Sequence, residues 1–109
     1  MPNDQRRRHF RIDYPSADRP VFRIGGADFA VVDIAEGGLR FEPQLKKFKP
    51  QEQIRGVITF ADKASFIVHG HVLREDRGQI IVILAQGIPL ARMLSEERYI
   101  IQKYGRKTG

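Results

Sequence analysis

The stretch VFRIGGADFAVVDIAEGGLRF, residues 21–41, decides the fold because short apolar segments alternate in it with glycine-containing turns. VFRI and DFAVVDI flank GGA, an arrangement typical of a β-hairpin. After the turn AEG, the segment GLRFE alternates cleanly: Leu39 and Phe41 share one face, and Arg40 and Glu42 share the other. The stretch therefore predicts consecutive antiparallel strands.

Further strands follow this stretch along the chain. IRGVITF, residues 54–60, places Ile54, Ile58 and Phe60 on one face, and SFIVHGHVLRE and QIIVIL are joined by DRG as a second hairpin. Five or six antiparallel strands in so short a chain need their edges closed or covered, and a small barrel provides that closure. We assign the barrel to residues 13–86.

The segment PLARMLSEERYIIQKYG changes to a helical period, with Pro89 suited to the first position and Gly105 to the stop. We expect one amphipathic helix within residues 87–105. A lone helix of this length is marginal in water, so its apolar stripe should pack on the barrel; docking of a partner or a second copy is the alternative. The stripe comprises Leu90, Met93, Leu94, Ile100, Ile101 and Tyr104.

Composition limits the class of protein. The 109 residues fit one domain with a single modest core, and a net charge of +6 favours an anionic partner. The absence of cysteine excludes disulfides and thiolate chemistry and fits a reducing compartment, so we expect a cytoplasmic protein. We expect no signal peptide and no membrane partner, because the first residues are polar and the longest apolar run, residues 80–85, is too short to span a bilayer.

The segment QRRRHFR, residues 5–11, concentrates four arginines and a histidine near the beginning of the chain. Repulsion among these charges is unfavourable unless water, salt or a bound anion relieves it. We expect residues 1–12 to form a flexible basic arm that folds over an anion when one is bound.

The combination of RRRHFRI with VVDIAEGGLRF resembles the PilZ domain family, whose signature is RxxxR followed by [D/N]xSxxG. Arg7 and Arg11 match the first motif, and Asp33 and Gly38 match the ends of the second, whereas Ala35 occupies the serine position. The carboxyl-terminal segment also resembles the closing helix of the family. The resemblance implies a mainly β fold, a six-stranded antiparallel β-barrel with a carboxyl-terminal helix, and binding of the bacterial second messenger cyclic di-GMP.

The implied ligand suits these residue types. A guanidinium can donate two parallel hydrogen bonds to a phosphate or to the O6/N7 edge of guanine, and it also stacks on purine faces. By resemblance, Asp33 would accept from guanine N1–H and N2–H, and Arg6 would favour an intercalated dimer of the ligand. A downstream protein would read the ordered arm. The residues implied in binding are Arg6, Arg7, Arg8, Arg11, Asp33, Ala35 and Gly38.

Structural explanations of the same residues also stand. A basic amino terminus can be a solubilising tail, and Asp33 can be a carboxylate at the end of a strand. Gly37 and Gly38 can serve a hairpin through positive φ angles. Because Ala35 offers no hydroxyl, a second hypothesis is a PilZ-fold adaptor that binds another protein and no nucleotide.

Other functions fit the sequence less well. A small barrel with a basic arm could bind RNA, but only Phe10 and Tyr14 lie beside the arginines as aromatic stacking platforms. His69 and His71 share a strand face without a third metal ligand nearby, so we expect no metal site and no cofactor. The three serines of the chain lack a nucleophile-elbow or triad context, and we expect no enzyme.

Overall fold

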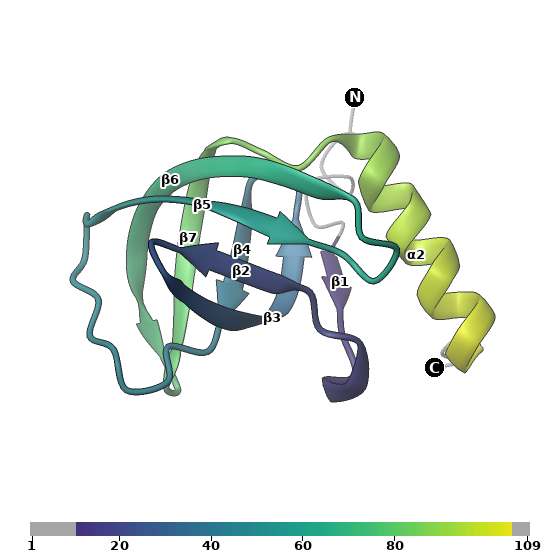
Figure 1. Cartoon of the computed structure of the whole chain (residues 1–109), viewed down its shortest axis with the longest axis horizontal. Coiled ribbons are helices and arrows are strands. Elements are labelled where there is room, and N and C mark those ends of the chain that lie inside the picture. Colours follow the sequence, from purple (N-terminus) through teal and green to yellow (C-terminus); the bar gives the residue numbers. More distant parts are fainter. Residues whose placement is uncertain (1–10, 106–109) are drawn as a thin grey trace, which may run out of the picture.

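The computed structural model describes residues 11–105, and Figure 1 shows a β-barrel with one long helix beside it. Strand residues far outnumber helical residues in the described chain, which confirms the predicted mainly β class. The elements are β1 (Arg11–Asp13), the 3-10 helix η1 (Ser16–Asp18), β2 (Val21–Ile24), β3 (Ala27–Ala35), β4 (Gly38–Phe41), β5 (Gln53–Thr59), β6 (Ser65–Asp76), β7 (Gln79–Gln86) and α2 (Leu90–Tyr104).

The six strands β2 to β7 form a closed antiparallel barrel. Their order is β3-β2-β5-β6-β7-β4, and pairing of β4 with β3 closes the ring. The two predicted hairpins join β2 to β3 and β6 to β7. Gly25 in the first turn has a φ of 63°, and Arg77 and Gly78 in the second have φ angles of 55° and 80°. Positive φ angles in short turns match the right-handed twist of the strands that they connect.

The core lies inside the barrel and is closed at both ends. Phe22, Phe41 and Ile58 are completely buried, as the alternation of their strands predicts. At one end Phe48, from the segment between β4 and β5, packs on Phe41 with ring centroids 5.2 Å apart. At the other end Met93 of α2 is fully buried.

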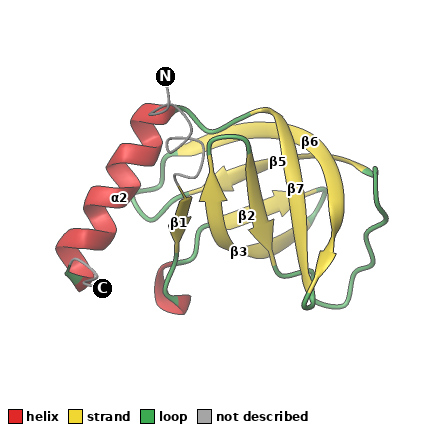
Figure 2. Cartoon of the chain, turned by 180° about the vertical axis from the view of Figure 1, so that it is seen from behind, coloured by secondary structure: helices red, strands yellow, loops and turns green. Residues whose placement is uncertain are grey.

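The helix α2 begins after Pro89 and ends at Gly105, whose φ is 83°, close to the predicted limits of residues 87–105. Its contact with the barrel is narrower than predicted: Met93, Glu96 and Ile100 face the barrel, whereas Leu90 is 52% exposed and Leu94 41%. The helix lies across one end of the barrel, beside β1 (Figure 2), so only part of the apolar stripe reaches the core. No helix within residues 11–105 is long and apolar enough to cross a membrane.

Buried polar groups fasten α2 to the barrel. The hydroxyl of Tyr14 donates to Oε1 of Glu96 at 2.7 Å, and Nη1 of Arg92 donates to Oε2 at 3.0 Å. Arg92 also pairs with Asp62 at 3.1 Å, and its guanidinium lies 5.1 Å from the ring centroid of Phe60. The pKa of Tyr14 is raised by burial first and by the Glu96 carboxylate second. One charged network thus joins the strand end at residue 14, the helix, and the turn between β5 and β6.

A second fastening lies nearer the end of α2. The carboxylate of Asp18 accepts hydrogen bonds from Tyr104, from Tyr99 at 2.7 Å and from Lys103 at 3.0 Å. These donors, Tyr104 first, lower the pKa of Asp18 to about 2. The segment that links β1 to β2 is therefore held against the helix at two places.

The strand β1 changes the predicted boundary between arm and barrel. Most of the predicted arm, residues 1–12, lies outside the described residues, but Arg11 and Ile12 belong to β1. β1 pairs with the last part of β3, beyond the part of β3 that pairs with β2. Ile12 is only 5% exposed, so burial of this side chain explains why the chain is already a strand here.

Candidate functional site

Six residues on β1, β3 and β4 form an array on the outside of the barrel. Cross-strand pairing sets them side by side in two rows of three, and we call this set the outer array. One row is Arg11, Ala35 and Gly38, and the other row is Asp13, Asp33 and Arg40.

The outward position of Asp33 depends on an irregularity in β3. Phe29, Val31 and Asp33 are two residues apart, so an unbroken strand would turn all three side chains into the core. The register with β4 shifts between Val31 and Asp33, and Ile34 is completely buried instead. This β-bulge therefore places the carboxylate of Asp33 outside, beside Arg40.

The side chain of Asp33 lies at the surface but is largely covered, with 11% of it exposed. Arg40 Nε lies 3.4 Å from Asp33 Oδ2, and Arg40 Nη1 lies 3.3 Å from Asp76 Oδ2 and 3.5 Å from Gln79 Oε1. Burial raises the pKa of Asp33, while Arg11 and Arg40 oppose that rise and Asp13 adds to it. The array thus holds a carboxylate whose charge is costly and is offset by two guanidinium groups.

Arg11 is held more loosely than Arg40. Its Nε lies 3.3 Å from Asp13 Oδ1, and the two side chains are 53% and 69% exposed. Exposed pairs of this kind contribute about 0–1 kcal/mol, so a bound anion can displace Asp13 at little cost. Arg11 therefore offers a guanidinium at the rim of the array that is available to a ligand.

An apolar strip adjoins the array on β7. Gly38 pairs with Ile83 and Arg40 with Ile81, and the side chains of these two isoleucines point outward because Ile80 and Val82 point into the core. Ile83 is 39% exposed. An exposed aliphatic surface beside arginines can contact the face of a planar ring.

Gly38 has a packing role within the barrel. A Cβ built on it would lie 2.7 Å from the carbonyl oxygen of Val82, so β4 can approach β7 closely only with glycine here. The interpretation through positive φ is wrong for both Gly37 and Gly38, because the glycines with positive φ in the described chain are Gly25, Gly78 and Gly105.

A groove of about 660 Å³ lies between β1 and α2, next to the array. Arg11 and Asp13 belong both to the array and to this groove, and Ile100 and Tyr104 line its helix side. The array therefore lies beside the helix that closes the barrel.

The model of the PilZ domain matches residues 5–100 of the chain. The chain belongs to the PilZ domain family. PilZ domains are a family of receptors for cyclic di-GMP, binding domains and not catalysts, and the closed six-stranded barrel with its helix confirms the fold expected from the resemblance. No curated protein matches the chain.

The structure brings together the predicted PilZ site residues that it describes. Arg11, from the first motif, is the direct neighbour of Ala35 in the second, and the half-buried Ala35 lies between Arg11 and Gly38 in one row of the array. The other predicted arginines, Arg6, Arg7 and Arg8, lie outside the described residues.

Four residues of the site were not predicted. Arg40 falls on the polar face of GLRFE, so the alternation of that segment already indicated an outward side chain. Asp13 lacked a signal because a strand of three residues shows no period, and the run QIIVIL does not show which of its isoleucines point outward. The four are Asp13, Arg40, Ile81 and Ile83.

The two histidines of VHGHV lie on β6, outside the six residues of the array, but His71 is the direct neighbour of the apolar strip beside it. His69 is exposed on β6 beside Arg55, and His71 pairs with Gln53 and with Ile83. Within residues 11–105, no three His, Cys, Asp or Glu side chains are grouped so that they could hold a metal ion.

Proposed function

We propose that this PilZ domain binds cyclic di-GMP on the outer array. The observation that supports the proposal is that Arg11 and Asp33, from two motifs far apart in the sequence, lie on neighbouring strands of one outward face. Arg11 supplies a guanidinium to a phosphate or to the O6/N7 edge of guanine. Asp33 accepts from guanine N1–H and N2–H, and Arg40 holds the carboxylate in place.

The apolar strip and the basic segment complete the proposed site. Ile81 and Ile83 provide a surface on which a purine face can lie. Arg6, Arg7 and Arg8 supply further charge, and we propose that Arg6 favours an intercalated dimer of the ligand. The expected stoichiometry is two ligands per chain, and Arg6→Leu should move it towards one in a calorimetric titration.

We propose that the chain acts as a binding protein in the cytoplasm and relays ligand occupancy to a downstream protein. The binding strand β1 ends at Asp13, immediately before Tyr14, whose hydroxyl donates to Glu96 in α2. A ligand that fixes the basic segment against the array would create a new surface beside this helix, and the partner would bind that surface.

Calorimetry with cyclic di-GMP tests the proposal through a pair of arginines. Arg11→Ala should weaken binding by about tenfold or more, because a hydrogen bond to a charged group typically contributes about 1.5–3 kcal/mol. Arg55 is an exposed arginine of β5 that pairs across the sheet with His69, away from the array, so Arg55→Ala should change the affinity less than about twofold.

Three results would contradict the proposal in different ways. Equal losses in both variants would show that net charge, and not the array, holds the ligand. Steep salt dependence together with tighter binding of single-stranded RNA would favour an RNA-binding barrel. An absence of nucleotide binding that Ala35→Ser does not restore would favour a PilZ-fold protein adaptor.

A further inference from the structure

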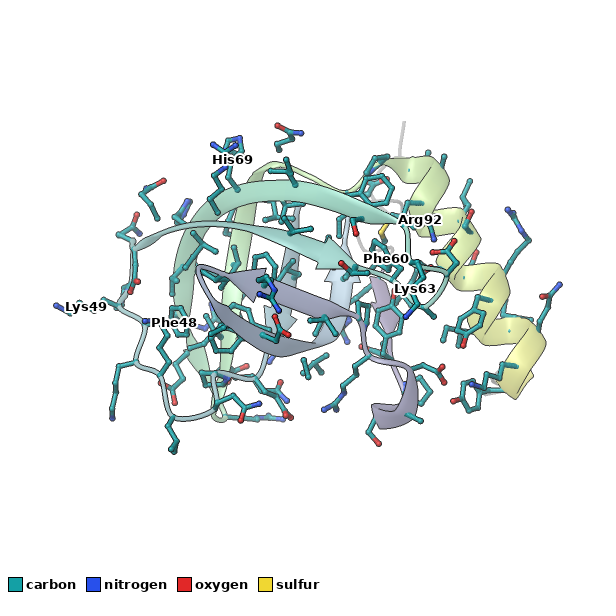
Figure 3. The ribbon with its side chains drawn as sticks, in the orientation of Figure 1. Phe48, Lys49, Phe60, Lys63, His69 and Arg92 are labelled. Atoms are coloured by element: carbon teal, nitrogen blue, oxygen red, sulfur yellow. The ribbon has the colours of Figure 1, made fainter. Side chains whose placement is uncertain are left out.

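The segment between β4 and β5 carries a cationic tip with an apolar side chain on it. We call residues 44–49, QLKKFK, the lysine loop. Leu45 is 97% exposed, and the three lysines of the loop are exposed around it. Figure 3 shows Lys49 pointing away from the molecule and Phe48 close to the barrel. The lysines are Lys46, Lys47 and Lys49.

The loop is fixed to the barrel on the carboxyl-terminal side of this tip, and a turn hydrogen bond closes the segment on the other side. Phe48 packs on Phe29 and Phe41, with centroids 5.7 Å and 5.2 Å away. Lys46 N donates to Pro43 O at 3.0 Å, and the backbone of Gln51 donates to Val72 O of β6 at 2.8 Å. The packed aromatic ring holds the loop in a shape that leaves Leu45 without a partner in the described chain.

Within the described residues, the carboxylates on either side of the lysine loop form no ion pair with its lysines. Glu42 pairs with Arg19 at 3.1 Å, and the carboxylate of Glu52 accepts from the backbone N–H of Lys49 at 2.9 Å. Nζ of Lys46 lies 5.5 Å from the ring centroid of Phe48, above the aromatic face. The lysine ammonium groups are therefore available to an external anion.

The chemistry of the loop fits a lipid surface better than a protein surface. Lysine is depleted in protein interfaces, and leucine is under-represented among the residues that dominate binding energy there. A single protruding leucine among flexible cations can instead enter the headgroup region while the lysine heads stay with lipid phosphates. We propose that the lysine loop binds an anionic lipid surface and inserts Leu45 into it.

This contact lies away from the helix end of the molecule. Figures 1 and 2 both show the segment between β4 and β5 on the side of the barrel opposite α2, so a membrane-bound chain leaves that end accessible. The expectation of no membrane partner rested on the lack of a spanning segment, which a peripheral contact does not need. The proposal does not depend on cyclic di-GMP binding.

Vesicle co-sedimentation of the full chain tests the proposal. The probes are vesicles of phosphatidylcholine alone and vesicles of phosphatidylcholine mixed equally with phosphatidylglycerol. We expect binding to the anionic vesicles, a loss of about fivefold for Lys49→Gln and a loss of about tenfold or more for Leu45→Ser. The basic segment at residues 5–11 is present in the parent and in every variant, so its contribution to vesicle binding is the same in each comparison.

Lys63→Gln is the matched control, because Lys63 is an exposed lysine near the α2 end of the molecule (Figure 3). It removes the same charge and should change vesicle binding less than about twofold. Equal losses for Lys63→Gln and Lys49→Gln would overturn the proposal, as would equal binding to neutral and anionic vesicles or no binding at all. Binding of poly-glutamate through Lys49 without any contribution of Leu45, and no binding of vesicles, would identify a docking site for an acidic protein instead.

Discussion

Replacing Tyr14 with phenylalanine removes one hydroxyl from the buried network and preserves the aromatic ring. Tyr14 is 5% exposed and Glu96 4%, so water cannot readily replace the bond of 2.7 Å between them. Glu96 would then keep Arg92 as its partner, at 3.0 Å. A hydrogen bond to a charged group contributes about 1.5–3 kcal/mol, and we expect the free energy of unfolding of Tyr14→Phe to fall by that amount.

The expected change in melting temperature follows from the length of the chain. Unfolding entropies of about 2.1 cal/mol/K per residue make 1 kcal/mol equivalent to about 4 °C for a domain of this size. Calorimetric melting of Tyr14→Phe at neutral pH should therefore show a Tm lower by roughly 6–13 °C.

Tyr99→Phe is the matched control, because it also removes one tyrosine hydroxyl bonded to a carboxylate. The carboxylate of Asp18 keeps Lys103 and Tyr104 as donors in that variant, so its Tm should fall by less than half as much. A Tm for Tyr14→Phe within about 2 °C of the parent would refute the reasoning. Equal losses of Tm in the two variants would show that the hydrogen bond to Glu96 contributes no more to stability than the one to Asp18.

Other predictions concern the outer array. Gly38→Ala should destabilise the fold by about 1–3 kcal/mol through contact with the carbonyl of Val82, and Gly37→Ala should be nearly neutral because its Cβ would meet nothing within 4 Å; chemical denaturation distinguishes them. Ala35→Ser should bind cyclic di-GMP more tightly, by up to about tenfold in calorimetry, because it adds one hydroxyl to the array, and unchanged or weaker binding would contradict the role given to this position. Burial raises the pKa of Asp33, so stability present at acid pH is lost as the pH rises through that pKa. Asp33→Asn should therefore melt no lower than the parent at neutral pH, with any advantage shrinking towards pH 4; a large loss of Tm at neutral pH would show that the pair with Arg40 outweighs the cost of burial.

The parts of the fold that the sequence predicted are those with a repeated pattern. Alternation in GLRFE correctly placed Leu39 and Phe41 in the core, and glycine-containing turns marked both hairpins. Pro89 and Gly105 marked the helix ends because each favours a backbone conformation found at such ends. In these cases, the residues of each segment were sufficient to predict its structure.

The missed features depend on contacts between distant segments. β1 is a strand only because the last part of β3 offers an edge beyond β2, and nothing in RID predicts that partner. The exposure of Leu90 and Leu94 follows from where α2 crosses the barrel end, which helical periodicity does not specify. For the site, the motifs named Arg11 and Asp33, but Arg40 became part of it only through strand pairing.

The bulge in β3 accommodates one extra residue, Val32, between a core position and the site. Val32 could be exchanged for many side chains without moving the strand, but deleting it would restore an unbroken alternation between Val31 and Asp33. After the deletion, Val31 would still point into the core and Asp33, now directly next to it, would point outward, so the carboxylate would stay on the array without a bulge. When related sequences are aligned, a gap at this position is therefore compatible with the site, as long as aspartate and glycine are both retained.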